Sequence, residues 1–426
     1  MSNEAAIPRT VPDRRLHWSR KAVQWGTMAI AVLIPLSGLF RIDPVEGAFI
    51  ILDRQIWFSD FFIVVGFWMA LSCGLVLTYS ALGNAFCGWS CPQNTLSEWA
   101  NRMTHKWLGK HAEVSLEGER MKVSRGKKKW LNWAVFLGLL VGMSMLLALV
   151  PMLYFLEPST IGAFVTLQPD DRLPASMYWI YSMFTLIILL DIGLIRHFWC
   201  RFMCIYGVWQ HSFKTRETLH IAHDKSHADE CARCNFCVSS CITRIDPRQT
   251  ETYDHCVNCG ECIVACNQVR AARNGGKSLL RFELGERAGQ YVDNMKSIGP
   301  LLNRFKAAIP LALLGLAMFV WGLWQYQPYH MTAYRADTMQ GDQILDYRVM
   351  VSNKRYQPAE LKVSVLGLPE NSYQLSRSRV VFESAGKQEV NIRLVDLPKG
   401  LYSMTIVVTS TDGWQERFLL RHFAGA

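Results

Sequence analysis

Long apolar runs without charged residues recur along this chain. No Asp, Glu, Lys or Arg occurs between Asp60 and Glu98, and the first part of this stretch, residues 61–82, is long enough to cross about 30 Å of hydrocarbon. Four further runs are comparable in length: residues 22–40, 130–156, 174–195 and 307–326. We therefore predict five transmembrane helices. No A-x-A-like site follows the first run, so we expect a retained anchor rather than a cleaved signal peptide.

Basic residues flank these runs unequally. Five precede the first run, nine lie in the connection after the second, and sixteen lie in the connection after the fourth. The connections on the opposite side hold only Arg41, Arg54 and Arg172. Because Lys and Arg collect in cytoplasmic loops, we predict that the N-terminus and residues 83–129 and 196–306 are cytoplasmic, and that the chain after Tyr326 is periplasmic. The net charge of +10 is then a topology signal, and we expect no nucleic-acid partner.

Eight of the thirteen cysteines lie within 36 residues. They form two quartets with the spacing C-x2-C-x2-C-x3-C, in which three thiolates hold one cluster and the fourth reaches the neighbouring cluster, as in two-cluster bacterial ferredoxins. We predict that two 4Fe-4S clusters are held by a first ligand set, Cys231, Cys234, Cys237 and Cys266, and a second ligand set, Cys256, Cys259, Cys262 and Cys241. Zinc is the alternative metal for Cys-x2-Cys pairs, but the duplicated run with an outlying fourth cysteine favours iron and sulfur.

Four other cysteines follow two of the apolar runs. They occur in "FCGWSCPQ" and "WCRFMC" as two Cys-x3-Cys pairs, and we call them the interface cysteines: Cys87, Cys91, Cys200 and Cys204. The i, i+4 spacing predicts that both thiols of a pair lie on one helix face. If the two halves are parallel repeats, the pairs meet and four thiolates surround one soft ion. A permanent third metal centre and reduced packing cysteines are the alternatives, whereas a reducing cytoplasm disfavours a disulfide.

Other polar residues near the runs are weaker candidates. Asp191 lies within the fourth run, and carboxylates inside a membrane are often functional. We expect the histidines that flank the interface cysteines to be solvated or interfacial: His105, His111, His197 and His211. Beyond the last run, three side chains that suit copper are too scattered to define a site: His330, Met331 and Met339. Nucleotide-binding glycine motifs do not occur, so we expect the electron donor to be another protein or a quinol.

These motifs, in this order, resemble the cytochrome c oxidase accessory proteins of the CcoG, FixG and RdxA type. The resemblance implies a bacterial inner-membrane iron–sulfur protein that reduces Cu(II) to Cu(I) for assembly of a cbb-type oxidase. Our hypothesis is that electrons pass from the clusters to copper held by some of the interface cysteines. Soft thiolates favour Cu(I) over Cu(II), which fits this chemistry. The chain has Ile205 where the family usually has proline after the second membrane pair, and Ile242 and Asn267 where the bacterial ferredoxin run usually ends in proline. These departures are consistent with a diverged paralogue.

The last part of the chain differs in kind from the rest. Beginning at Ile344 it has short alternating runs, such as "LDYRVMVSN" and "YSMTIVVTS", separated by turn residues, which predicts a β-sandwich. The family resemblance also implies an immunoglobulin-like β-sandwich here. We expect this domain to bind an oxidase assembly factor or a copper chaperone, or to serve only as a stabilising cap.

The expected organisation has five parts. They are a cytoplasmic tail (1–21), a four-helix membrane domain with the duplicated motif (22–198), a cytoplasmic ferredoxin-like domain with its linker (199–306), a fifth transmembrane helix (307–326) and a periplasmic β-sandwich (335–426). Two functions fit this organisation. The first is a cupric reductase for oxidase assembly. The second is a quinol-linked electron-transfer subunit of a larger respiratory complex, of the nitrate-reductase membrane-ferredoxin type.

Overall fold

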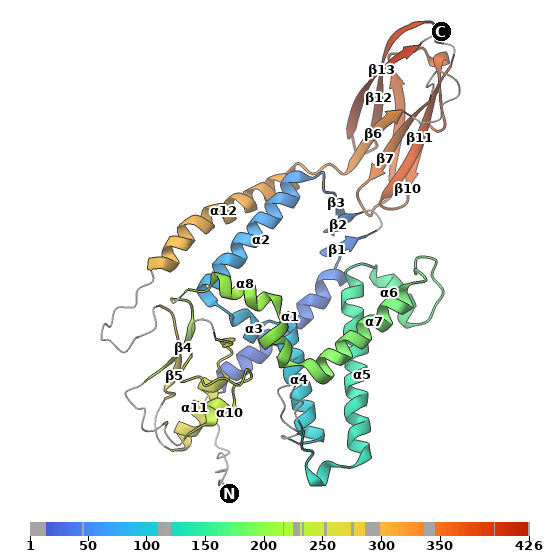
Figure 1. Ribbon diagram of the computed structural model, residues 1–426. Coiled ribbons are helices and arrows are strands. Elements are labelled where there is room, and N and C mark those ends of the chain that lie inside the picture. Colours follow the sequence, from blue (N-terminus) through green and yellow to red (C-terminus); the bar gives the residue numbers. More distant parts are fainter. Residues whose placement is uncertain are drawn as a thin grey trace. The chain divides into compact units, whose positions relative to one another are not determined.

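The computed structural model divides the chain into two compact units (Figure 1). The first contains residues 1–36 and 65–318, and the second contains residues 37–64 and 319–426. The structure describes residues 14–44, 47–109, 112, 121–215, 217–224, 231, 234–250, 254–273, 277–285, 299–335, 346–395 and 397–424.

Four of the described helices are long and apolar enough to cross a membrane. They are α2 (Phe61–Leu82), α5 (Trp130–Leu153), α7 (Met177–Leu190) with the π-helical turn that continues it (Asp191–Ile195), and α12 (Gly299–Trp324), whose apolar part is Leu301–Trp324. Each corresponds to one of the predicted spans, and α2 has the predicted limits. Their side chains are mostly exposed within the protein, as expected for helices that contact lipid.

The remaining predicted span, residues 22–40, is shorter in the structure. Helix α1 (Arg15–Leu36) starts earlier and contains the buried Arg20 and Lys21, and strand β1 (Phe40–Asp43) follows its end. The part of α1 after Lys21 is only about 22 Å long at 1.5 Å per residue. The apolar part of α1 is therefore too short to cross a membrane, and α1 is not among the four described helices that are long and apolar enough.

The core of the first unit lies where helix α4 packs against two of the membrane helices. After α2 come α3 (Ala85–Trp89) and the amphipathic α4 (Pro92–Trp107), and buried residues of α4 pack against α5 and the end of α7. The packed residues are Leu96 and Ala100 of α4, Phe136 and Leu140 of α5, and Ile192 of the π-helical turn that continues α7. Shorter elements complete this part: the 3-10 turn η2 (Arg125–Lys127), α6 (Pro158–Val165), a π-helical turn (Trp199–Met203) and α8 (Ile205–Phe213).

Helices α2 and α12 approach each other closely through glycine. A Cβ atom on Gly315 would lie 2.6 Å from the backbone nitrogen of Ala70 and 3.0 Å from the oxygen of Gly66. Seven residues later, a Cβ on Gly322 would lie 2.8 Å from the nitrogen of Ile63. Small residues on one helix face permit this backbone contact, which is a common way to pack membrane helices.

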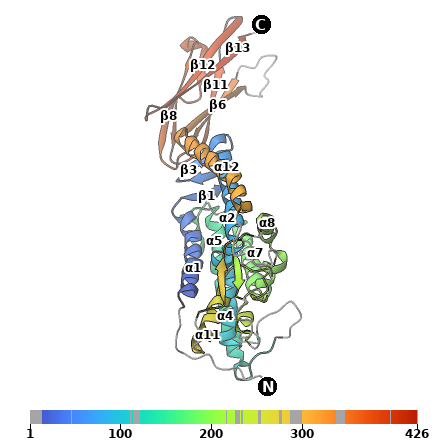
Figure 2. The same cartoon turned by 90° about the vertical axis from the view of Figure 1, so that its left-hand side faces the viewer.

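The ferredoxin-like part of the first unit is small. It contains α10 (Phe236–Ser239), α11 (Glu261–Ala272) and a two-stranded antiparallel sheet of β4 (His220–His223) and β5 (Leu280–Glu283). Its buried residues include two of the predicted ligands, Cys237 and Cys262. Figures 1 and 2 both show α11 near the N-terminal part of α1, and the two helices are in contact.

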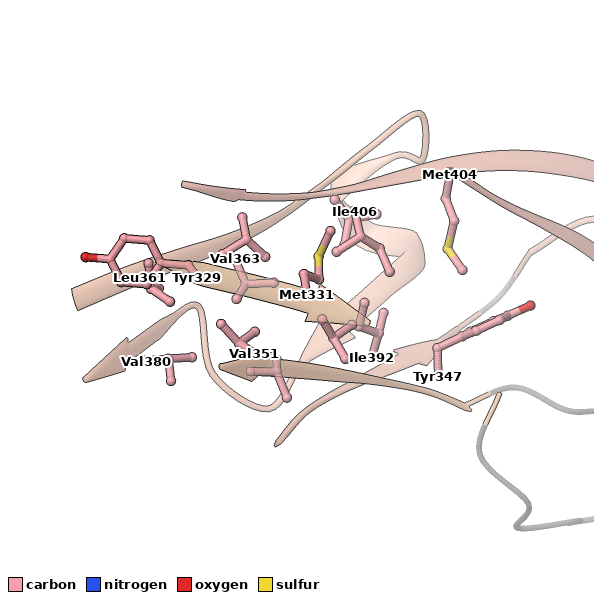
Figure 3. Packing of buried hydrophobic residues seen from close by; sticks show 14 of the residues in the cluster. Tyr329, Met331, Tyr347, Val351, Leu361, Val363, Val380, Ile392, Met404 and Ile406 are labelled. Atoms are coloured by element: carbon pink, nitrogen blue, oxygen red, sulfur yellow. The ribbon is translucent and has the colours of Figure 1, made fainter. Parts of the chain in front are cut away.

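The C-terminal strands form two four-stranded antiparallel sheets around one apolar core. Strand order is β10-β8-β12-β13 in one sheet and β6-β7-β11-β9 in the other. The strands are β6 (Tyr329–Arg335), β7 (Asp346–Asn353), β8 (Ala359–Leu366), β9 (Tyr373–Leu375), β10 (Arg379–Phe382), β11 (Gly386–Leu394), β12 (Gly400–Ser410) and β13 (Gln415–Ala424). Figure 3 shows Met331, Ile392 and Ile406 converging between the sheets. This part is a β-sandwich, and β6 extends it ahead of the expected start at residue 335.

A small sheet before α2 belongs to the same unit as the sandwich. It consists of β1 with β2 (Ala48–Ile51) and β3 (Arg54–Ile56). Gln55 donates a backbone hydrogen bond of 2.8 Å to the oxygen of Lys354, and the Lys354 ammonium lies 2.7 Å from a carboxylate oxygen of Asp60. The segment between α1 and α2 is thus fastened to the sandwich, which the sequence did not indicate.

Candidate metal centres

The first ligand set lines one cavity. Its four cysteines, Cys231, Cys234, Cys237 and Cys266, surround about 250 Å³. Arg248 donates to the backbone oxygens of Cys231 (3.3 Å) and Cys234 (3.5 Å), and its guanidinium also pairs with Asp246 at 2.7 Å. Burial raises the pKa of Cys237 to about 11. The cavity therefore brings together the four thiols that the interleaved spacing assigned to one cluster.

The thiols of the second ligand set lie near enough to affect one another's ionisation. Burial raises the pKa of the Cys262 thiol, and Cys259, Cys256 and Cys241 act on it in the same direction. Burial likewise raises the pKa of Cys256 to about 12. These thiols need a positive centre to become thiolates, and a bound iron–sulfur cluster provides one. The donor set of each quartet thus fits the cofactor that its spacing predicts.

The two interface pairs have the same local conformation. Cys87 lies in the short helix α3 and Cys200 in a five-residue π-helical turn, while Cys91 and Cys204 each precede the first residue of a helix. The backbone of Cys91 (φ −66°, ψ 123°) and that of Cys204 (φ −74°, ψ 112°) are both extended. The expectation that each pair occupies one helix face is therefore wrong, because the helical turn ends between the two cysteines. At Cys91 the following proline enforces this break, and Cys204 adopts it without proline.

The four interface cysteines line a single cavity of about 670 Å³. Burial raises the pKa of Cys87 to about 12, and the charge of Cys91 adds to this shift. Burial also raises the pKa of Cys200, with contributions from Cys91, Cys87 and Cys204. For Cys91, hydrogen bonds from the backbone of Asn94 and Gln93 oppose the rise that burial causes. Backbone donors at the start of α4 thus favour a thiolate at Cys91.

Within the described ranges, no three His, Cys, Asp or Glu side chains lie close enough to hold one metal ion. This applies to the interface cysteines and equally to both ligand sets. A 4Fe-4S cluster requires a wider arrangement, because each thiolate binds a different iron atom. The four thiols at the interface share a cavity, but they are not arranged as the ligands of a single ion.

The loop of the second ligand set packs directly against the first interface pair. A Cβ atom on Gly88 would lie 2.3 Å from the backbone oxygen of Val257 and 3.0 Å from the Cα of Cys259. Next to it, Trp89 Nε1 donates to the backbone oxygen of Asn258 at 2.9 Å. Since Gly88 lies between Cys87 and Cys91, this backbone contact brings the two cysteine sites together.

A buried charged network fixes this junction. Arg20, which is 1% exposed, donates from Nε to the backbone oxygen of Gly88 (2.7 Å) and from Nη1 to Glu261 (2.7 Å). Arg20 and Lys21 both pair with Glu98 of α4. In the sequence, Arg20 is one of the five basic residues before the first apolar run, and its position in "SRKAVQW" next to that run is the only signal of a buried charge that needs a partner.

Two models of iron–sulfur families match the chain. A 4Fe-4S binding domain matches residues 64–111, and a 4Fe-4S dicluster domain matches residues 210–285. Protein RdxA of Cereibacter sphaeroides is 24% identical over 68% of this chain and 67% of its own length. Nitrogen fixation protein FixG of Rhizobium meliloti is 25% identical over 57% of this chain and 48% of its own length. The chain is a homologue of RdxA and FixG. It is accordingly a membrane-type iron–sulfur electron-transfer protein.

The homology extends to another protein type. Ferredoxin-type protein NapH of Haemophilus influenzae is 25% identical over 45% of this chain and 63% of its own length. A solved FixG-related protein from Vibrio parahaemolyticus covers 23% of this FixG homologue and 97% of its own chain, with 16% identity and a TM-score of 0.20. The matched part of the chain covers about half of the length of FixG and about two thirds of the length of RdxA.

The weaker candidates have mainly structural contacts in this FixG homologue. Asp191 accepts a hydrogen bond of 2.8 Å from Gln93, and His197 Nε2 lies 3.1 Å from Asn94 Oδ1, so the residues after Cys91 reach across to the second repeat. Met331 is 2% exposed and fills the sandwich core. His111, Met339 and the side chain of His211 lie outside the described residues.

Proposed function

We propose that this chain reduces Cu(II) to Cu(I) at the cavity of the interface cysteines, for assembly of a cbb-type oxidase. The observation that supports this proposal is the contact of Gly88 with Val257 and Cys259, because it brings the loop of the second ligand set against the turn between Cys87 and Cys91. Clusters held by the two ligand sets would supply one-electron transfer.

The side chains of the chain itself have distinct roles in this proposal. Some of the interface thiolates bind copper, and their softness makes Cu(I) the favoured state. Cu(II) takes up one electron to become Cu(I), and a reduced cluster held by either ligand set would supply that electron. Gln210 and the backbone donors of Gln93 and Asn94 position the thiols of Cys87 and Cys91.

The test replaces all four interface cysteines by serine in the full-length protein. Wild-type and variant proteins are purified without oxygen and reduced with dithionite; excess reductant is then removed, and Cu(I) formation is followed with a Cu(I)-specific chelator. We expect the variant to lose most of the reduction and to keep the iron of the two ligand sets. Cys73→Ser, in the middle of α2, is the matched control. Unchanged copper reduction in the quadruple variant would contradict the proposal.

A second candidate is a permanent third iron–sulfur centre in a quinol-linked subunit. It is favoured by the 4Fe-4S binding model over residues 64–111, which include Cys87 and Cys91, and by the similarity to NapH. Iron analysis separates the candidates, because this one requires three clusters' worth of iron in the wild type and two in the quadruple variant. Oxidation of a soluble quinol analogue by the wild type, without copper turnover, would favour this candidate over the first.

We also propose that the protein lies in the inner membrane of a bacterium, with the orientation that the basic residues predict. The ferredoxin-like part is then cytoplasmic, the β-sandwich is periplasmic, and the sandwich is the docking site for an oxidase assembly factor or a copper chaperone. The concentration of Lys and Arg in two of the connections supports this orientation. Reporter fusions after Ala112 and after Ala424 test it, since alkaline phosphatase is active only on the periplasmic side. Activity of the first fusion, or inactivity of the second, contradicts it.

A further inference from the structure

A large basic cavity lies next to the cavity of the interface cysteines, and Arg201 lines both. It has a volume of about 610 Å³ and is enclosed by α1, α4, the segment after α7 and the segment after α10. Six cationic side chains line it, against two carboxylates, Glu98 and Glu261. The cations are Arg20, Lys21, Arg102, Arg196, Arg201 and Arg244. Since both carboxylates already contact Arg20 or Lys21, the cavity as a whole carries a positive excess.

The arginines come from four separate parts of the first unit: α1, α4, the segment after α7 and the segment after α10. Arg196 is 3% exposed, and its guanidinium is held by the backbone oxygen of Ile192 (3.0 Å) and by Asn101 Oδ1 (2.8 Å). Arg102 and Arg244 are exposed and lie on α4 and on the segment after Cys241, respectively. Guanidinium groups at several angles around one cavity suit an anion with several acceptor oxygens, such as phosphate.

The position of the cavity indicates where such a group comes from. Ile195, the last residue of the membrane-spanning segment Met177–Ile195, lines the cavity, and so does Arg196, which follows it. The cavity therefore begins where the hydrocarbon ends, at the depth of lipid headgroups. Basic pockets at the ends of membrane helices bind anionic headgroups.

We propose that this cavity binds a phosphate group, supplied by the headgroup of an anionic phospholipid. The ligand contacts Arg102 and Arg244 at the exposed edges and approaches Arg196 at the buried wall. Because α1, α4 and the ferredoxin-like part all contribute to the walls, a bound headgroup holds these parts together beside Cys241. A soluble phosphate compound offers the same chemistry, and the experiment separates the two sources.

The experiment uses the full-length protein in lipid nanodiscs and native mass spectrometry. One arm compares phosphatidylglycerol with phosphatidylcholine, and the other adds inorganic pyrophosphate to detergent-solubilised protein. We expect retention of phosphatidylglycerol over phosphatidylcholine, and a loss of about tenfold in Arg102→Gln/Arg244→Gln. The matched control is Arg125→Gln/Lys128→Gln, which removes two exposed charges outside the cavity and should bind as the wild type does.

Three outcomes decide the proposal. Selective retention of phosphatidylglycerol that the Arg102/Arg244 variant loses supports it. Binding of pyrophosphate alone, with the same loss, overturns the lipid as the source. Absence of any bound phosphate compound in the wild type, or an equal loss in the control variant, overturns the site. The quadruple cysteine variant should bind as the wild type does, so this result is independent of the proposed copper reduction.

Discussion

The Sγ atom of Cys87 donates a hydrogen bond of 3.1 Å to Oε1 of Gln210. Cys87 belongs to the first interface pair, and Gln210 is a fully buried residue of α8, the helix that follows the second pair. This bond connects the two repeats, so that cysteines more than a hundred residues apart in sequence line one cavity. The contact makes the interface cysteines one site rather than two.

The interleaved ligand sets can be tested with two double variants. Cys231→Ala/Cys266→Ala removes two ligands of the first set only, so we expect loss of one cluster and about half of the iron of the two sets. Cys231→Ala/Cys241→Ala removes one ligand from each set, so both clusters should be lost. Iron analysis and electron paramagnetic resonance of the reduced proteins measure this. Ligation by contiguous runs predicts the reverse result for the two variants, and zinc in place of iron contradicts both.

The close contact at Gly88 should not tolerate a side chain. In Gly88→Ala the new Cβ meets the backbone of Val257 and Cys259, which cannot move away as a flexible side chain would. We expect a loss of stability of about 1–3 kcal/mol and slower electron transfer to the interface site, with cluster content retained. Thermal unfolding and the copper assay measure the two effects.

Gly126→Ala is the control for this variant, because a Cβ at Gly126 meets nothing within 4 Å. It should leave both measurements unchanged. A wild-type reduction rate in Gly88→Ala, with the protein folded, would show that this contact does not limit electron transfer.

The packing of α2 against α12 depends on the absence of a side chain at Gly315. In Gly315→Ala the added methyl group overlaps the backbone of Ala70 and Gly66, and we expect a destabilisation of about 1–3 kcal/mol. Gly138→Ala makes the same change on α5, where a Cβ meets nothing within 4 Å, and should change stability by less than about 0.5 kcal/mol. Thermal unfolding of both variants in one detergent is the measurement. Equal melting temperatures would contradict the close helix contact.

The ion pair of Lys354 and Asp60 should contribute strongly to the stability of the second unit. The Lys354 side chain is only 4% exposed, so Asp60→Asn leaves a buried ammonium without its carboxylate, at a cost of about 3 kcal/mol. The exposed pair of Arg379 and Glu360 gives the matched control, since Glu360→Gln should cost less than about 1 kcal/mol. We expect faster proteolysis of residues 37–60 in Asp60→Asn alone. Similar proteolysis of both variants would contradict the prediction that the buried pair stabilises the second unit more than the exposed pair does.

Local patterns account for much of the fold. The limits of α2 follow from the apolar first part of the uncharged run after Asp60, and six of the eight sandwich strands follow from alternating runs. Strands β6 and β9 were not predicted. Strand β9 has only three residues, too few to show an alternating pattern, and β6 lies ahead of the point at which the alternating runs were taken to begin. The span predicted at 22–40 was too long because hydropathy does not reveal that the chain turns into β1.

The sequence by itself determined the chemistry of this protein: the spacing of its cysteines, their division into two quartets and two pairs, and the apolar runs that need a membrane. These are local properties, because each depends on residues within a few positions of one another. Only the tertiary structure decided that the two pairs share one cavity, that Gly88 contacts the Cys259 loop, and that arginines of four segments surround a common space. Those relationships join residues that are distant in the chain, and they arise from the buried network around Arg20 and from backbone contacts that no local pattern encodes.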